Sequence, residues 1–201
     1  ITLKGRCICT ALFFMLVKIV NFIFFKENAY PKQSCKELIS WFENNKHLAS
    51  KGKAGKKDLE NLEITLELTS SECFNNLGLT LEEGVKDFKL DYPNFDSYLS
   101  PWKLNNFCQL CRFLPNNYYN YIHCEQGNDK DEITRVFAWM IYLNNIDQGG
   151  ETEFVDYKFK TKPKAGNLYI WPAGPTHLHR GVPCNENKYF LTGWFNYKTI
   201  V

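Results

Sequence analysis

The chain has 201 residues, of which 16% are aromatic, and a formal net charge of +2. This length fits one domain that buries roughly two-thirds of its surface on folding, and the composition excludes a disordered chain. The small net charge leaves no basic footprint for nucleic acid, so we expect no nucleic-acid partner.

The first residues form an apolar run that is compatible with more than one role. Residues 7–17 are largely apolar and follow Lys4 and Arg6, as in a signal peptide or a membrane anchor. Polar residues interrupt the run further on, and an uncut anchor needs roughly 20 apolar residues. We therefore expect a hydrophobic leader at 1–18 and a single domain at 19–201.

Two helices are predicted in the first half of the chain, each from a capping-box pattern. Ser34 followed by Glu37 predicts one helix start, and Thr80 followed by Glu83 predicts the other. Pro93 should end the second helix, because a proline cannot continue the helical hydrogen bonding.

The remaining pattern predicts β-structure. Residues 19–25 read as a first strand, and residues 62–68 alternate apolar and polar side chains as a half-buried strand does. Turn signals then separate six more strands, at 105–114, 118–126, 134–144, 151–160, 167–171 and 187–197. Short strands at this spacing indicate a jelly-roll barrel or a sandwich.

Eight cysteines include one Cys-x-x-Cys pair, Cys108 and Cys111. Residues three apart on a strand face opposite sides, so we do not expect these two thiols to share a metal ion. Buried thiols in a reducing compartment are the expectation, which favours a cytoplasmic protein. A membrane-anchored or secreted protein is the alternative, if residues 1–25 act as an anchor.

The chemistry is concentrated in one constellation. Residues i and i+2 of a strand share a face, so His123 and Glu125 should project side by side. His179, from a distant strand, would complete two imidazoles and one carboxylate, the ligand set typical of non-haem Fe(II) oxygenases. Lys188 and Thr192 share a face of the last strand, and a buried ammonium there needs an anionic partner, such as a dicarboxylate.

Residues 105–197 resemble the core of the Fe(II)/2-oxoglutarate dioxygenases, in the prolyl 4-hydroxylase-like branch, and look closest to small stand-alone phage and bacterial homologues. The matching elements are His123-x-Glu125, Arg135, Tyr142-Leu143-Asn144, Gly149-Gly150-Glu151-Thr152-x-Phe154, Pro163-Lys164-x-Gly166, His179-x3-Pro183, Lys188 and Thr192-x-Trp194. The resemblance implies a mainly β fold with N-terminal helices and a double-stranded β-helix core, which is jelly-roll or cupin-like.

The same resemblance implies a metal centre and a co-substrate site. His123, Glu125 and His179 would bind Fe(II) and form the catalytic centre. Lys188 would pair with the distal carboxylate of 2-oxoglutarate, and Tyr142 and Thr192 would hydrogen-bond that carboxylate or its water. Arg135, His177 and Trp194 are the candidates for substrate contact.

The implied reaction is hydroxylation of an unactivated C–H bond, with O2 consumed and 2-oxoglutarate decarboxylated to succinate. A peptidyl proline is one expected substrate; a free amino acid or a small metabolite is the other. Ascorbate is implied as a reductant. No oligomeric state is predicted, and membrane contact is expected only if residues 1–25 are an anchor.

Two positions leave alternatives open. Most of the family has Asp where this chain has Glu125, whose extra methylene moves the carboxylate by about one C–C bond; we expect metal binding to survive. His177 and His179 have the same parity, and the spacing to Pro183 and Lys188 favours His179 as the ligand. A non-catalytic cupin-like metal-binding module is the competing class, and a zinc hydrolase ranks last.

Overall fold

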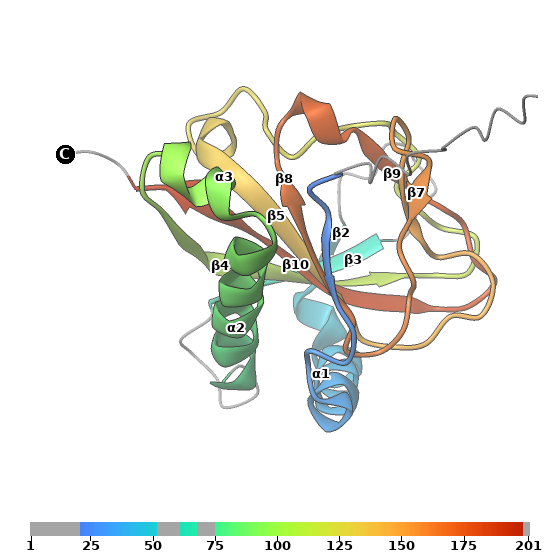
Figure 1. Ribbon diagram of the computed structural model, residues 1–201. Coiled ribbons are helices and arrows are strands. Elements are labelled where there is room, and N and C mark those ends of the chain that lie inside the picture. The colour runs from blue at the N-terminus through green and yellow to red at the C-terminus, as the bar shows by residue number, and fades with distance from the viewer. Residues whose placement is uncertain (1–20, 52–60, 68–74, 199–201) are drawn as a thin grey trace, which may run out of the picture.

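The computed structural model describes residues 21–51, 61–67 and 75–198 (Figure 1). Its elements are β1 (Phe24–Lys26), α1 (Lys32–Asn45), η1 (Lys46–Leu48), β2 (Ser50–Lys51), β3 (Asn61–Glu67), α2 (Asn75–Asp91), α3 (Pro93–Tyr98), β4 (Trp102–Phe113), η3 (Glu132–Thr134), β5 (Arg135–Tyr142), β6 (Thr152–Phe154), β7 (Phe159–Lys160), β8 (Leu168–Pro172), η4 (Pro175–His177), β9 (His179–Gly181) and β10 (Lys188–Tyr197). The expected leader at 1–18 lies outside these residues. Within them, no helix combines the length and the apolar character that a membrane crossing requires.

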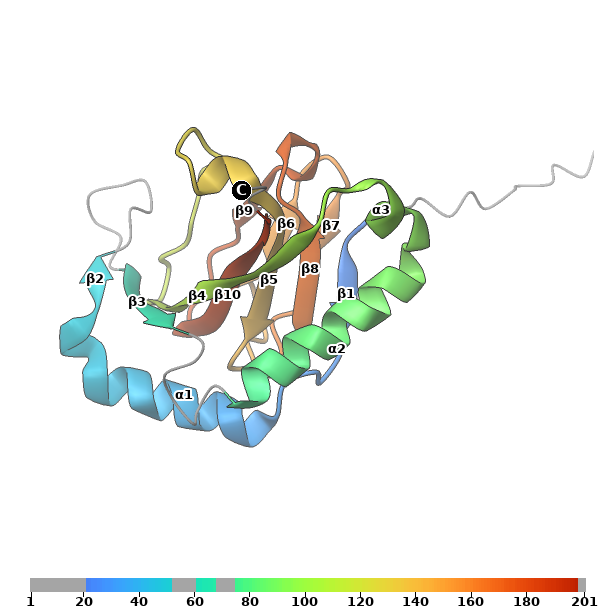
Figure 2. The same cartoon turned by 90° about the vertical axis from the view of Figure 1, so that its left-hand side faces the viewer.

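Two antiparallel sheets form the jelly-roll core. The larger sheet has the order β1-β8-β5-β10-β4-β3-β2 and the smaller one β7-β6-β9. Figure 1 shows α1 and α2 together on one side of the larger sheet, and Figure 2 shows both helices running beneath it. The mainly β fold with N-terminal helices is therefore confirmed.

The larger sheet is covered on both faces, which explains why β5 is apolar almost throughout. Phe137, Trp139 and Ile141 pack with the helices in one buried cluster. Ala138 and Met140 pack in the second cluster, which faces the smaller sheet. Alternate side chains of one strand thus enter different cores, as the two-residue period of a strand requires.

The same alternation separates the two cysteines of the Cys-x-x-Cys pair. Cys108 lies in the cluster under the helices and Cys111 in the cluster between the sheets. The prediction that they face opposite sides of their strand is confirmed.

Both helices begin earlier than the capping-box patterns predict, so those two predictions are wrong. α1 starts at Lys32 after Pro31, with no side-chain cap, and Ser34 is buried inside its first turn. α2 starts at Asn75, and the Thr80 hydroxyl donates instead to the carbonyl of Ala29 at 3.4 Å. Tertiary contacts thus use the hydroxyls that a cap would have used.

The strand predictions hold best where the pattern is long. β10 and β5 match their predicted ranges closely, and Pro93 follows the end of α2 at Asp91, where it begins α3. The range 151–160 contains two strands, because residues 155–158 make a turn in which Lys158 has φ 50°. The range 118–126 is an extended loop, not a strand, and pairs through an isolated bridge at His123.

Candidate active site

Backbone pairing brings the two histidines together. The amide of His123 donates to the carbonyl of His179 at 3.0 Å, and the amide of His179 donates back at 2.9 Å. Their rings consequently lie 4.3 Å apart between centroids. The amide of Glu125 donates to the carbonyl of Ala173, just after β8, and this fixes the loop to the larger sheet.

Each imidazole is oriented by a backbone carbonyl. The Nδ1 atom of His123 lies 3.0 Å from the carbonyl oxygen of Tyr121, and that of His179 lies 2.9 Å from the carbonyl oxygen of His177. In a metal-bound form, a proton on each Nδ1 would leave each Nε2 with a lone pair for the metal, which is the arrangement that ligating histidines adopt. Burial and the neighbouring His179 lower the pKa of His123, which favours the neutral ring.

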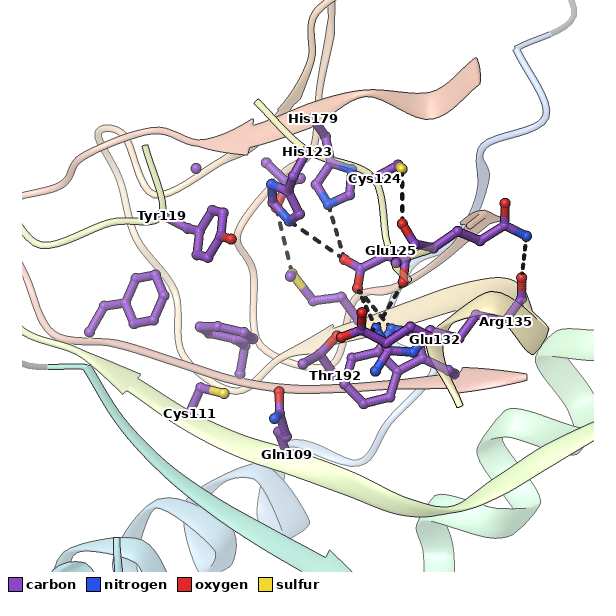
Figure 3. Close-up of a pocket in the computed structure, with 18 of the residues that line it drawn as sticks. Gln109, Cys111, Tyr119, His123, Cys124, Glu125, Glu132, Arg135, His179 and Thr192 are labelled. Carbon is purple, nitrogen blue, oxygen red and sulfur yellow. Dashed lines mark hydrogen bonds and ion pairs between the residues drawn. The ribbon is translucent and has the colours of Figure 1, made fainter. Parts of the chain in front are cut away.

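The three candidate ligands converge on one point. Oε1 of Glu125 lies 3.2 Å from Nε2 of His179 and 3.8 Å from Nε2 of His123. All three ligand atoms lie within 4.8 Å of one another. Adjacent ligands at bond lengths of about 2.1 Å would be about 3 Å apart, so the side chains fit a metal ion with small adjustments. Figure 3 shows the three residues turned toward one another at the cavity wall.

The second oxygen of Glu125 is held from the other side. The indole Nε1 of Trp194 donates to Oε2 at 2.8 Å, and Nη1 of Arg135 lies 4.0 Å from the same oxygen. The Arg135 guanidinium stacks on the Trp194 ring at 3.9 Å. Burial would raise the pKa of Glu125, but the hydrogen bond and charge of His179, with His123 and Trp194, lower it to about 2. The carboxylate is therefore ionised, as a metal ligand must be.

Lys188 lies in the same cavity, which has a volume of about 350 Å3. Its side chain is 4% exposed, and its ammonium lies 4.9–5.8 Å from the ring centres of Phe190, Tyr142 and Phe113. Burial lowers the pKa of Lys188 to about 8, against the weaker opposing effects of Cys184, Cys111 and Glu151. No ion pair within the described residues neutralises this ammonium, so the cavity carries a cation suited to an anionic ligand.

The other predicted co-substrate residues are arranged differently from each other. Thr192 lines the cavity and donates its hydroxyl to the carbonyl of Trp139 at 3.0 Å. The hydroxyl of Tyr142 instead lies 2.5 Å from Thr161 Oγ1 and 3.3 Å from Thr152 Oγ1. Tyr142 therefore presents its ring to the ammonium, and the expectation that its hydroxyl reaches the co-substrate carboxylate is not supported.

The candidates for substrate contact separate into two kinds. Arg135 and Trp194 line the cavity. His177 is 2% exposed and does not line the cavity. Its Nε2 atom lies 2.8 Å from the carbonyl oxygen of Asn21, and its Nδ1 atom lies 3.0 Å from the Thr176 hydroxyl. The expectation that His177 faces substrate is corrected for this reason: η4 ends at His177, and the shared parity with His179 is lost.

Several cavity residues are absent from the sequence-based set. The register of β4 against β10 pairs Gln109 with Thr192, Cys111 with Phe190 and Phe113 with Lys188. These alternate positions therefore share one inward face, and the predicted inward face of the last strand could have identified them. Figure 3 shows Gln109 and Cys111 below the metal-ligand trio and Tyr119 beside His123.

Comparison with known proteins agrees with this geometry. Residues 108–196 match the family model of the 2OG-Fe(II) oxygenase superfamily. A mimivirus (Acanthamoeba polyphaga mimivirus) protein named "Putative prolyl 4-hydroxylase" is 33% identical over 104 residues, which cover 43% of this chain and 43% of that protein. The chain thus aligns with less than half the length of that curated relative.

Solved structures share the fold. The viral collagen prolyl hydroxylase of Paramecium bursaria Chlorella virus-1, in its 2OG complex, has a TM-score of 0.67 at 18% identity and covers 89% of this chain and 97% of its own. A Trichoplax adhaerens prolyl hydroxylase, in complex with a hypoxia inducible factor peptide fragment, has a TM-score of 0.67 at 15% identity, covering 88% and 84%.

The fold is that of the solved prolyl hydroxylases, and the site brings together two histidines and one glutamate that could hold a metal ion. The β-core of this chain, residues 108–196, is similar in sequence to the 2OG-Fe(II) oxygenase superfamily.

Proposed function

We propose that this chain hydroxylates a peptidyl proline in an Fe(II)- and 2-oxoglutarate-dependent reaction. One observation carries the proposal: two imidazole nitrogens and an ionised carboxylate converge in a cavity that also holds a buried ammonium. Neither feature alone defines the chemistry. A ligand that fits both features must chelate the metal ion with one end and carry an anionic group at the other end, where the unneutralised ammonium lies.

His123, Glu125 and His179 would hold the iron. All three line one wall of the cavity, so a metal ion held by them would be reached from the cavity. When bound, Fe(II) supplies the redox chemistry that couples O2 and the 2-oxo acid to C–H hydroxylation. The contribution of this chain is to orient those ligands, as Trp194 does for the second oxygen of Glu125.

Lys188 would bind the distal carboxylate of 2-oxoglutarate. The aromatic rings of Phe113, Tyr142 and Phe190 surround the ammonium and keep water from competing for it. Because the charge is already desolvated, its attraction to a carboxylate is screened less than it would be at the surface. Thr192, on the same inward face, has a hydroxyl oxygen that can still accept a hydrogen bond.

The peptide character of the substrate is supported by the surface beside the metal ligands. Tyr121 and Ile122 are 48% and 53% exposed and directly precede His123. The ring of Tyr119 packs 4.2 Å from that of His123. These side chains extend an apolar surface beyond the cavity, which suits a ligand longer than a single amino acid. The similar proteins are named as prolyl hydroxylases, which supports the same substrate class.

The first experiment tests the co-substrate. Anaerobic protein with Fe(II) and 2-oxoglutarate should show a weak metal-to-ligand absorption band, and on admission of O2 it should release succinate slowly without substrate. Ascorbate should sustain this slow turnover. Lys188→Ala should abolish succinate release and Lys188→Arg should restore part of it. A folded protein that shows neither the band nor succinate favours the cupin-like binding module.

The second experiment tests the substrate. Proline-containing peptides and a panel of free amino acids are incubated with the loaded enzyme, and mass spectrometry follows products that gain one oxygen atom. A peptide product formed in step with succinate supports the proposal. Coupled hydroxylation of a free amino acid alone would retain the oxygenase chemistry and overturn the peptide assignment.

A further inference from the structure

A second concave surface lies on the helix-covered side of the larger sheet, away from the metal-ligand trio. It is a groove of about 720 Å3 between α2 and the adjoining ends of β4 and β10, and we call it the lysine groove. Four lysines line it: Lys86, Lys89, Lys103 and Lys198. Figures 1 and 2 show α2 passing along this side of the sheet, with β4 beside it.

The floor of the lysine groove is apolar and recessed. Leu81 and Phe195 belong to the buried core at 0% and 3% exposure, and the half-buried Trp102 and Val85 cover them. At Gly78 a side chain would meet nothing within 4 Å, so the helix wall is open there. A ligand must therefore insert apolar groups between the helix and the strands, rather than rest on a flat face.

The rim is strongly cationic for a chain with so small a net charge. Lys86, Lys103 and Lys198 are exposed and form no ion pair with any residue that the structure describes. Lys89 lies over the Trp102 ring, 5.0 Å from its centre. Glu82 is the one acidic side chain among the described lining residues. Three exposed lysines that have no ion pair among the described residues therefore face one carboxylate around an apolar floor.

We propose that the lysine groove docks an acidic, amphipathic segment of a polypeptide partner. Its carboxylates would pair with the lysines, and its apolar side chains would cover Trp102 and Val85. A bilayer would not reach a recessed floor, and nucleic acid would leave the apolar floor without a partner. β10 joins this groove to the active site, because Trp194 lines the cavity and the next residue, Phe195, lines the groove on the opposite face.

This proposal does not depend on the oxygenase reaction, so its test measures binding. The probe is a fluorescein-labelled peptide built of Glu, Leu and Ala, and fluorescence anisotropy at low ionic strength follows its binding to the whole chain. The matched peptide with Lys in place of Glu should not bind. Raising the salt concentration to several hundred millimolar should weaken binding about tenfold, because surface charges are screened.

Two variants locate the site. Changing Lys86, Lys103 and Lys198 together to Glu should weaken binding at least about tenfold, since three attractions become repulsions. Changing Lys32, Lys36 and Lys162 to Glu alters the net charge equally and should leave binding unchanged, because these exposed lysines lie outside the groove. Gly78→Leu should fill the open end and reduce binding without changing any charge.

Three results would overturn the proposal. One is an acidic peptide that does not bind, and another is equal weakening by the two triple variants. The third is lysine-dependent sedimentation with phosphatidylcholine–phosphatidylserine vesicles in the absence of peptide binding, which would make the groove part of a membrane-contacting surface. Succinate release by each variant gives an independent reading of the metal site.

Discussion

The indole nitrogen of Trp194 donates a hydrogen bond of 2.8 Å to the Glu125 oxygen that points away from His179. This bond holds the longer glutamate side chain with Oε1 directed at the two histidines. The extra methylene of Glu125 is thus matched by a fixed donor behind the carboxylate. Outer hydrogen bonds of this kind commonly change metal affinity by about 10- to 100-fold.

Trp194→Phe should therefore weaken metal binding about tenfold while keeping the aromatic surface under Arg135. Titration calorimetry with Mn(II), which avoids oxidation, measures the effect directly. Trp139→Phe is the matched control, because its buried Nε1 has no hydrogen-bond partner among the described residues. Equal affinities in the wild type and Trp194→Phe would show that the bond does not position the carboxylate.

Glu125→Asp tests whether the site is built around the longer side chain. The shorter carboxylate would withdraw from Trp194 by about one C–C bond and lose either that hydrogen bond or its approach to the histidines. We expect Mn(II) affinity to fall several-fold, although aspartate is the more frequent residue in the family. Tighter binding by Glu125→Asp would mean that Glu125 is a strained ligand.

His179→Ala should remove metal binding, whereas His177→Ala should retain it. Of these two histidines, His179 directs a ring nitrogen at Glu125, whereas the ring of His177 is engaged by Asn21 and Thr176. Metal content per chain, measured after loading and desalting, distinguishes the two variants. A thermal melt of each variant shows whether a loss of metal reflects unfolding. Loss of metal in folded His177→Ala would assign that residue a ligand role.

The sequence alone was enough to predict that His123, Glu125 and His179 come together, because the pattern survives an error in secondary structure. Residues 118–126 are a loop and not the predicted strand, yet the bridge between His123 and His179 keeps the loop extended there. His123 and Glu125 consequently still face the same side. Residues two positions apart in an extended segment point to the same side, whether or not that segment pairs with a strand along its length.

The alternation of side chains along a regular strand does not give the side that Arg135 faces, because the strand pairing shifts there. Arg135 and Tyr142 are seven residues apart and should face opposite sides of a regular strand. The pairing of β10 with β5 shifts between Phe195 and Asn196, which changes the side that Arg135 faces and brings it to the cavity. Single-sequence patterns do not show such bulges, because they arise from contacts between strands.

The orientation of the Tyr142 hydroxyl was also beyond the sequence. Its two partners, Thr152 and Thr161, come from β6 and from the segment after β7, and only the packing of the smaller sheet brings them together. The position of the ring beside Lys188 follows from strand pairing, since Phe190 lies opposite Tyr142 in the register.

Lys188→Met should stabilise the protein in the absence of ligand. Burial depresses the pKa of this lysine from 10.5 to about 8, so at pH 7 the fold carries the cost of a desolvated charge. A shift of this size corresponds to a gain of about 3 kcal/mol in the free energy of unfolding when the charge is removed. Urea unfolding with Mn(II) and 2-oxoglutarate absent measures the difference.

The pH dependence of the stability difference between Lys188→Met and the wild type gives a second check. For a base with a depressed pKa, the cost is fully present below the folded pKa of about 8 and disappears as pH approaches the unfolded value of 10.5. The advantage of the variant should therefore shrink between pH 8 and pH 10. A variant less stable than the wild type at pH 7 would indicate that the ammonium has a stabilising partner.

The affinity for 2-oxoglutarate should fall above pH 8. In the proposed site the distal carboxylate would bind the protonated form of Lys188, whose pKa in the free protein is about 8. At pH 9 about one-tenth of the molecules carry that proton, so the apparent affinity should be about tenfold weaker than at pH 7.

Lys188→Arg is the matched control, because its guanidinium stays charged throughout this range. Any decline that persists in Lys188→Arg originates at the metal and is subtracted. If the wild type and Lys188→Arg decline in parallel, the lysine proton is not linked to binding, and the anchoring cation must be sought elsewhere in the cavity.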